Sequence, residues 1–116
     1  MTKLLAVPAA EWRGFFDRLS KAALGKHADI EVASLDLGDQ VIAEWMPLVG
    51  ITYDSGDDLL DVALDGGTNH LIRHPRDIVV EEDAGSIRSV TVVDGEGTRQ
   101  VVKLREPLTL PPVQGP

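Results

Sequence analysis

The spacing of apolar residues changes once along this chain, and that change limits the folds open to it. Between Pro8 and Leu24, large apolar side chains recur three or four residues apart, which places them on one face of an amphipathic α-helix. They are Trp12, Phe15, Phe16 and Leu19. From Asp29 onward, apolar and polar residues alternate with a period of two, which is typical of half-buried β-strands. One helix followed by a β-rich body is therefore expected.

Short turns separate the strand-like segments of this body. Clusters of Gly, Asp and Pro lie between them, and gaps of a few residues are too short for helical crossovers. Consecutive strands should therefore pair as antiparallel hairpins in a meander, most clearly across the Asp-Gly turn at Asp94–Gly97. The segments are Asp29–Val32, Gln40–Trp45, Val49–Tyr53, Leu59–Leu64, Asn69–Arg73, Ile78–Glu82, Ile87–Val93 and Arg99–Leu104.

The aromatic face of the helix needs a surface to cover, and an antiparallel sheet with one apolar face provides it. We therefore predict an α+β fold in which one N-terminal amphipathic helix packs on a curved antiparallel β-meander sheet, or a half-open barrel, of about six to seven strands. A chain of 116 residues has the size of one domain, which we place at residues 1–105. Residues 106–116 contain four prolines, which cannot donate sheet hydrogen bonds, and are predicted to form a frayed tail.

Charge is distributed unevenly along the chain. The formal net charge is −8, yet residues 27–72 hold ten acids and no Lys or Arg. Excess negative charge repels phosphate, so nucleic acid and anionic membranes are not expected as partners. Because unopposed charge of this density repels itself, we expect basic residues of the helix and of the C-terminal third to lie near the acidic middle.

The composition also limits the compartment and the chemistry. Cysteine is absent, which excludes a disulfide framework, thiolate zinc sites and thiol catalysis, and favours a reducing cytoplasm. The sequence has neither a signal-peptide core nor a run of eighteen apolar residues. A cytoplasmic protein is therefore expected.

Titratable and basic groups crowd together in the segment His70–Arg76. In a strand, His70 and His74 lie about 13 Å apart, too far to share one metal ion. Arginine and histidine side chains in this segment can donate hydrogen bonds to a carboxylate or phosphate. The alternative is that the two arginines pair with the acidic strands. The candidate ligand-binding or anion-binding set is His70, Arg73, His74 and Arg76, with Asp39 and Gln40 nearby.

Other polar clusters have simpler explanations. Asp54–Asp58 brings three carboxylates together around a Gly, but it lacks the regular ligand spacing of a calcium loop and reads equally well as a hairpin turn. The acidic segment Glu81–Gly85 is interpreted in the same way, as a hairpin turn rather than a calcium loop. No serine lies in a nucleophile elbow, and no Gly-rich phosphate loop precedes a helix. No catalytic residue, metal or cofactor is predicted.

Several segments taken together are similar to a known family. Trp12, Phe15 and Phe16 in the helix, with the segments Ile30–Val32, Asp36–Gln40, Pro47–Asp54 and His70–Pro75, resemble a bacterial family called domain of unknown function number five-three-three-five. The resemblance covers roughly residues 8–105. It implies a small, stand-alone bacterial protein and supplies no activity, cofactor or catalytic residue.

Two functions remain open. The first is a non-enzymatic protein-interaction or accessory module of a bacterial cytoplasm, because an open strand edge can add a partner's strand and an acidic surface can attract a basic one. Its partner would be another protein or a second copy, and a homodimer would use an uncovered strand or Trp45 and Met46. The alternative is a small-molecule or anion-binding protein, or an enzyme, that uses His70–Arg76.

Overall fold

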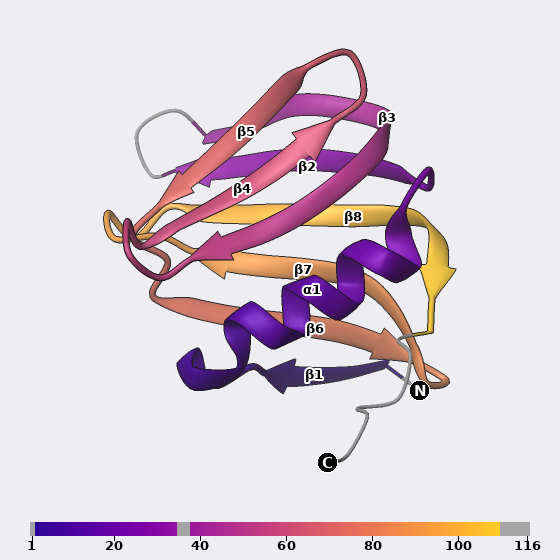
Figure 1. The fold of residues 1–116 in the computed structure, drawn as a ribbon, viewed down its shortest axis with the longest axis horizontal. Helices are drawn as coiled ribbons and strands as arrows, with labels where there is room; N and C mark the ends of the chain where they lie inside the picture. Colours follow the sequence, from indigo (N-terminus) through magenta and orange to yellow (C-terminus); the bar gives the residue numbers. More distant parts are fainter. Residues whose placement is uncertain (1, 35–37, 110–116) are drawn as a thin grey trace.

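A computed structural model describes residues 2–34 and 38–109 of the chain. In this part of the chain, one α-helix accompanies an eight-stranded sheet that does not close into a barrel, with strand order β1-β6-β7-β8-β2-β3-β4-β5 (Figure 1). Every strand pair is antiparallel. The elements are β1 (Thr2–Ala6), the 3-10 turn η1 (Ala9–Glu11), α1 (Trp12–Ala23), β2 (His27–Ser34), β3 (Gly38–Asp54), β4 (Leu59–Leu64), β5 (Thr68–Arg73), β6 (Asp77–Asp83), β7 (Ser86–Val93) and β8 (Arg99–Leu108).

The predicted amphipathic helix is present but shorter than expected. The α-helical turns begin at Trp12 rather than Pro8, because the residues after the proline wind into η1 and no side chain caps the helix start. The C-terminal signal is confirmed, since the helix ends at Ala23 and Gly25 follows with φ +80°. The predicted apolar face is buried, and it consists of Trp12, Phe15, Phe16, Leu19 and Ala23.

The strand count of six to seven was wrong. Two predicted strands join into the 17-residue β3, whose first half pairs with β2 and whose second half pairs with β4. The chain bends between the halves near Trp45, which has φ +47°, and Pro47, which has no N–H to donate. An additional strand, β1, comes from the short apolar run before Pro8.

The predicted simple meander was also wrong. Only β2 to β5 and β6 to β8 follow one another as neighbours; β5 and β6 do not pair, and β8 pairs with β2 instead. The connection between β5 and β6 turns at His74, which has φ +53°, and Pro75. It carries the chain from one terminal strand to the opposite end of the sheet, where β1 then pairs with β6.

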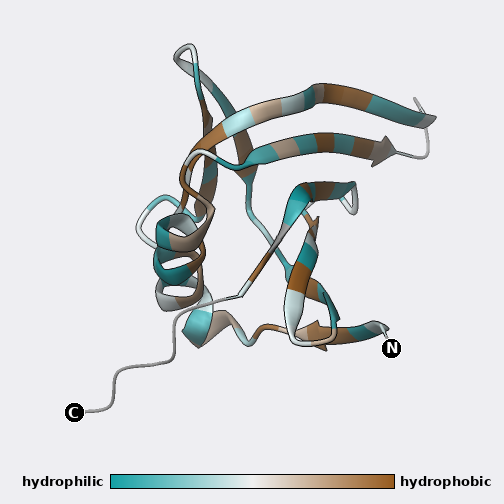
Figure 2. Cartoon of the chain, turned by 90° about the vertical axis from the view of Figure 1, so that its right-hand side faces the viewer, coloured by the Kyte–Doolittle hydropathy of each residue, from teal (hydrophilic) through white to brown (hydrophobic). Residues whose placement is uncertain are grey.

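One face of the sheet forms the core together with α1. The register aligns Val80, Val90, Val102, Ile30 and Ala43 in one row across five strands, and all of them are buried. Apolar and polar residues alternate along the strands (Figure 2), as expected when each strand turns one face inward. The ring of Phe15 contacts that of Phe16 edge to face at 5.0 Å, which confirms the packing role predicted for the helix aromatics.

The helix also covers an open strand edge. The second half of β3 lacks β2 beside it, and there Ser20 of α1 takes the place of a neighbouring strand. Its hydroxyl accepts a hydrogen bond from the N–H of Ile51 at 2.8 Å and donates to the C=O of the same residue at 2.7 Å. One side chain thus satisfies both backbone groups of a residue that is 1% exposed.

The ladder of β8 continues beyond the expected domain end at Arg105. Leu108 pairs with Ile87 and is buried. The carboxylate of Glu106 accepts hydrogen bonds from the backbone N–H and the ring Nδ1 of His27, both at 2.9 Å, and these bonds lower the pKa of Glu106. The rest of the predicted tail, residues 110–116, lies outside the described residues. No helix among the described residues is long and apolar enough to cross a membrane.

Among the residues that the structure describes, the acidic middle of the chain forms one ion pair with a lysine or arginine. Lys103 on β8 forms an ion pair with Glu31 on β2 at 2.6 Å. Among the described residues, no other Lys or Arg pairs with an acid of residues 27–72. Within the described ranges, ion pairing by the C-terminal third is therefore limited to β2, and the carboxylates of β4 and its flanking turns form no ion pair with Lys or Arg. From the helix, Arg13 comes near this region, where it lines a pocket together with Asp54.

Candidate functional site

A cleft opens beside β5, the terminal strand of the sheet. Its volume is about 500 Å³, and its walls are the last residues of β5 on one side and the β7–β8 turn on the other. The lining residues are Leu71, Arg73, His74, Asp94, Gly95, Glu96 and Gln100. Two members of the predicted set, Arg73 and His74, therefore line the same cleft.

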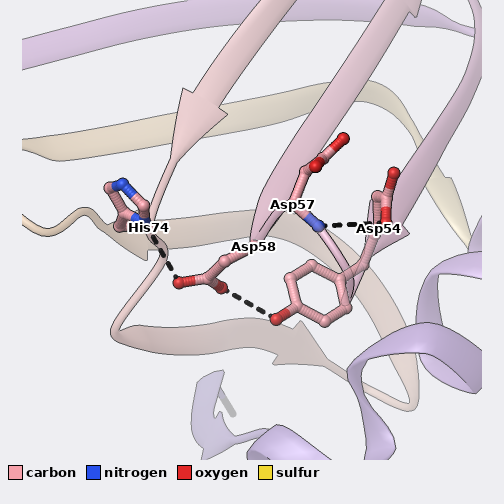
Figure 3. Close-up of polar contacts among 5 residues, drawn as sticks. Asp54, Asp57, Asp58 and His74 are labelled. Atoms are coloured by element: carbon pink, nitrogen blue, oxygen red, sulfur yellow. Dashed lines mark hydrogen bonds and ion pairs between the residues drawn. The ribbon is translucent and has the colours of Figure 1, made fainter.

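A carboxylate from the preceding hairpin holds His74. Asp58 accepts a hydrogen bond from Nδ1 of His74 at 3.3 Å and from the hydroxyl of Tyr53 at 2.8 Å (Figure 3). The bond to Asp58 raises the pKa of Tyr53. Because a carboxylate can only accept, the Nδ1–H of His74 is the donor in this bond. The side chain of His74 is 71% exposed, so a ligand in the cleft can reach the ring.

The backbone at this contact is unusual. Both Asp58 and His74 adopt left-handed conformations, with φ of +49° and +53°. The N–H of His74 also donates to the C=O of Asp58 at 2.8 Å. Non-glycine residues rarely occupy this region, and those that do concentrate at turns and binding sites. Backbone and side-chain contacts together fix the position of the imidazole.

Behind the cleft lies a hydrogen-bonded network that sequence reasoning missed. Nε2 of His70 donates to Oε1 of Gln100 at 2.5 Å, and Nε2 of Gln100 donates to Asp94 at 2.9 Å. Asp94 and Gln100 are more than nine-tenths buried. The other oxygen of Asp94 accepts from the N–H groups of Glu96 and Thr98, which fixes the β7–β8 turn. The acceptor role of Asp94 orients the Gln100 amide, and that amide in turn fixes the tautomer of His70.

A glycine allows the two walls of the cleft to meet. A Cβ added at Gly95 would lie 3.0 Å from the Cβ of His74 and 3.3 Å from its backbone oxygen. Such contacts are tighter than nine in ten real Cβ contacts, so a larger residue would require His74 or the β7–β8 turn to shift by a few tenths of an ångström. The sequence signal for this position was the Asp-Gly pair, which predicted a turn but not the contact.

The remaining predicted site residues lie elsewhere. Arg76 lines a separate, mostly apolar groove of about 520 Å³ next to Val7 and Trp12. Asp39 and Gln40 are exposed at the start of β3 and are not part of the cleft lining. Within residues 2–34 and 38–109, no three His, Cys, Asp or Glu side chains are close enough together to hold a metal ion.

The surroundings of the cleft are predominantly acidic. The Asp54 carboxylate accepts from the backbone N–H groups of Gly56 and Asp57, so it stabilises the turn that the sequence also suggested as a calcium loop. Asp61 accepts from the side-chain amide of Asn69 on β5. Within β4, β5, the turns before and after β4 and the cleft lining, one arginine, Arg73, is accompanied by seven acids: Asp54, Asp57, Asp58, Asp61, Asp65, Asp94 and Glu96.

Comparison with known proteins places the chain among uncharacterised relatives. An uncharacterised protein of Aquifex aeolicus strain VF5 is 40% identical over 106 residues, which cover 91% of this chain and 96% of the relative. No solved structure matches the chain. Residues 4–113 match a family of unknown function, a wider range than the expected 8–105. The chain therefore belongs to that family of unknown function (DUF5335).

Proposed function

We propose that this protein is a non-enzymatic interaction module of the bacterial cytoplasm that binds an extended, basic segment of a partner protein along β5. The observation that carries this proposal is the cleft beside a terminal strand. A terminal strand presents unpaired backbone N–H and C=O groups, and an added strand satisfies them. The cleft would receive side chains of the added strand and so provide specificity.

The edge of β5 is regular enough to accept a strand. Its six residues pair with β4 without any register shift, whereas β3 is bulged against both of its neighbours. Bulges hinder pairing at an edge, and a straight edge favours it. Leu71, which is 42% exposed and lines the cleft, offers an apolar contact in the middle of this edge.

Charge favours a basic partner. The seven acids around β5 and the cleft greatly outnumber Arg73, and no lysine or arginine among the described residues forms an ion pair with any of them, although Arg13 of α1 lines a separate pocket together with Asp54. An acidic surface accelerates association with a basic segment, and salt screens that effect. Arg73 itself would donate hydrogen bonds to one acidic side chain or to a C-terminal carboxylate of the partner.

Selection from random short peptides displayed on phage tests this function. Enriched peptides should contain Lys or Arg alternating with apolar residues, bind more weakly as salt rises, and shift the amide NMR signals of β5 and the β7–β8 turn. Leu71→Lys should weaken their binding by about tenfold or more, because the added positive charge at the edge repels the Lys and Arg side chains of the peptides. Val49→Lys, at a position 50% exposed on β3, is the matched control and should bind normally. Absence of enrichment, or binding that shifts other strands, refutes the proposal.

A second candidate function, binding of a small anion, is favoured by the way Asp58 holds His74 beside Arg73. The Arg73 guanidinium offers donors that suit a carboxylate or phosphate, and the His74 ring beside it would report a bound anion. Titration with inorganic phosphate, with chloride at equal ionic strength as the control, should then shift the ring signals of His74 and not those of His27. If the ring signals of His74 and His27 shift equally, the small-anion function is refuted and the basic peptide is favoured as the ligand. Glu96 and Asp94, which line the same cleft, would repel anions.

A further inference from the structure

The opposite end of the sheet carries a second open edge. The strand β1 pairs with β6 in a register without shifts, from Thr2 opposite Asp83 to Ala6 opposite Val79. All five of its residues are exposed, and Leu4 is 72% and Leu5 44% exposed. We propose that this edge binds a second copy of the chain, with two β1 strands pairing antiparallel about a two-fold axis at Leu4.

The two faces of β1 are compatible with this pairing. Leu4 lies opposite Glu81 on the outer face, whereas Lys3 and Leu5 lie on the face that holds the buried Val80. A two-fold axis at Leu4 places each Leu4 opposite its counterpart and each Lys3 opposite Leu5 of the second copy. Residues of the same face therefore meet, and the two sheets continue into one another without a change of face.

Charge selects β1 rather than β5 for self-association. The β1 strand contains no acid and only one charged residue, Lys3, whereas the β5 edge is surrounded by carboxylates that would repel an identical edge. The acids nearest to β1 lie on β6. In the dimer the two β6 strands would be separated by about 14 Å, three strand spacings, which exceeds the Debye length of about 8 Å at physiological salt. Repulsion between the two acidic copies is therefore smallest at this edge.

The expected dimer is weak and reversible. A five-residue strand is about 17 Å long, so the contact is smaller than the roughly 1,200 Å² that stable complexes bury. It would place the two β5 edges at the far ends of one continuous sheet. Both clefts would remain free, and a dimer could bind two segments of one partner with increased avidity.

Cysteine cross-linking tests both the edge and the register, because the natural chain has no cysteine. Directly opposed residues of an antiparallel pair have Cα atoms about 4.5–5.5 Å apart, within the range of a disulfide. Leu4→Cys should therefore form a disulfide-linked dimer under mild oxidation. Leu5→Cys should react more slowly, since its counterpart is two residues out of register and about 8 Å away.

Leu24→Cys provides the matched control, because Leu24 is also a highly exposed leucine, at 67%, but follows α1. Cross-linking of Leu24→Cys as fast as Leu4→Cys indicates random collision and overturns the proposal. Faster cross-linking of Leu5→Cys than of Leu4→Cys overturns the register.

Sedimentation of the unmodified protein gives an independent measurement. The average mass should rise with concentration for the natural chain and for Leu24→Lys, and it should remain that of a monomer for Leu4→Lys. Circular dichroism should show the same fold in all three, because both leucines are exposed. A natural chain that stays monomeric at all concentrations refutes the proposal, as does a dimer that persists in Leu4→Lys.

Discussion

Replacing Ser20 by alanine tests whether the helix acts as a substitute strand. The hydroxyl of Ser20 bonds to both the N–H and the C=O of Ile51, at 2.8 and 2.7 Å. Ser20→Ala removes both bonds at once and offers no other partner. Because Ile51 is buried, water cannot readily replace the lost hydroxyl.

The expected loss of stability follows from the N–H and C=O groups of Ile51, which both lose their hydrogen-bond partner. Each buried group left without a hydrogen bond costs about 1–3 kcal/mol. Alanine returns about 0.5 kcal/mol through its better helix propensity. The net loss in the free energy of unfolding should therefore be about 1.5–5.5 kcal/mol, which is a large fraction of the stability of a domain this size.

Urea denaturation followed by circular dichroism measures this loss as a lower midpoint with an unchanged slope. Ser55→Ala is the matched control, because Ser55 is exposed in the β3–β4 turn, and its effect should stay within about 0.5 kcal/mol. A loss below about 0.5 kcal/mol for Ser20→Ala would refute the reasoning and show that the open edge of β3 does not depend on the helix hydroxyl.

Three further changes probe the core, the cleft and the charged face. Phe16→Ala should lower the free energy of unfolding by about 3–5 kcal/mol in urea denaturation, because Phe16 is fully buried and its removal leaves a cavity. Gly95→Ala should cost about 1–3 kcal/mol and shift the NMR signals of His74, because the new Cβ would lie 3.0 Å from that side chain. Asp29→Asn should be more stable than the natural chain at about pH 7, and the difference in urea midpoint should shrink toward about pH 4. Burial raises the pKa of Asp29, so the ionised carboxylate destabilises the folded chain. This destabilisation is complete above the folded-state pKa and disappears as the carboxyl group is protonated.

The parts of the fold that depend on local sequence could be predicted. The stripe of Trp12, Phe15 and Phe16 requires only one helix and one apolar surface, and the structure provides both. The extent of the strands could not be predicted, because Pro47 usually ends a strand, whereas here it lies at the bend where β3 passes from β2 to β4. The pairing of β8 with β2 depends on residues far apart in the chain, which turn lengths do not constrain.

The site was predicted only where its chemistry lay within one short segment. Arg73 and His74 are neighbours in sequence and line the same cleft, but their partners come from other hairpins. One signal for the buried network was present in the sequence. Gln100 lies two residues before Val102 and four before Leu104 on the inward face of β8, so a polar side chain occurs in a row of apolar ones. Such a position requires a buried partner, which here is Asp94.

The charge distribution acquires a more definite meaning in the folded chain. Lys103 bonds to Glu31, and this bond raises the lysine pKa, so the acids of β2 are partly neutralised within the fold. The carboxylates of Asp54, Asp58 and Asp61 make hydrogen bonds with Tyr53, Asn69 and backbone N–H groups, which fix their positions without cancelling their charge. Negative charge that the fold leaves uncancelled costs stability through self-repulsion. A basic segment bound at β5 would relieve that repulsion, so the proposed partner should stabilise the chain most at low salt.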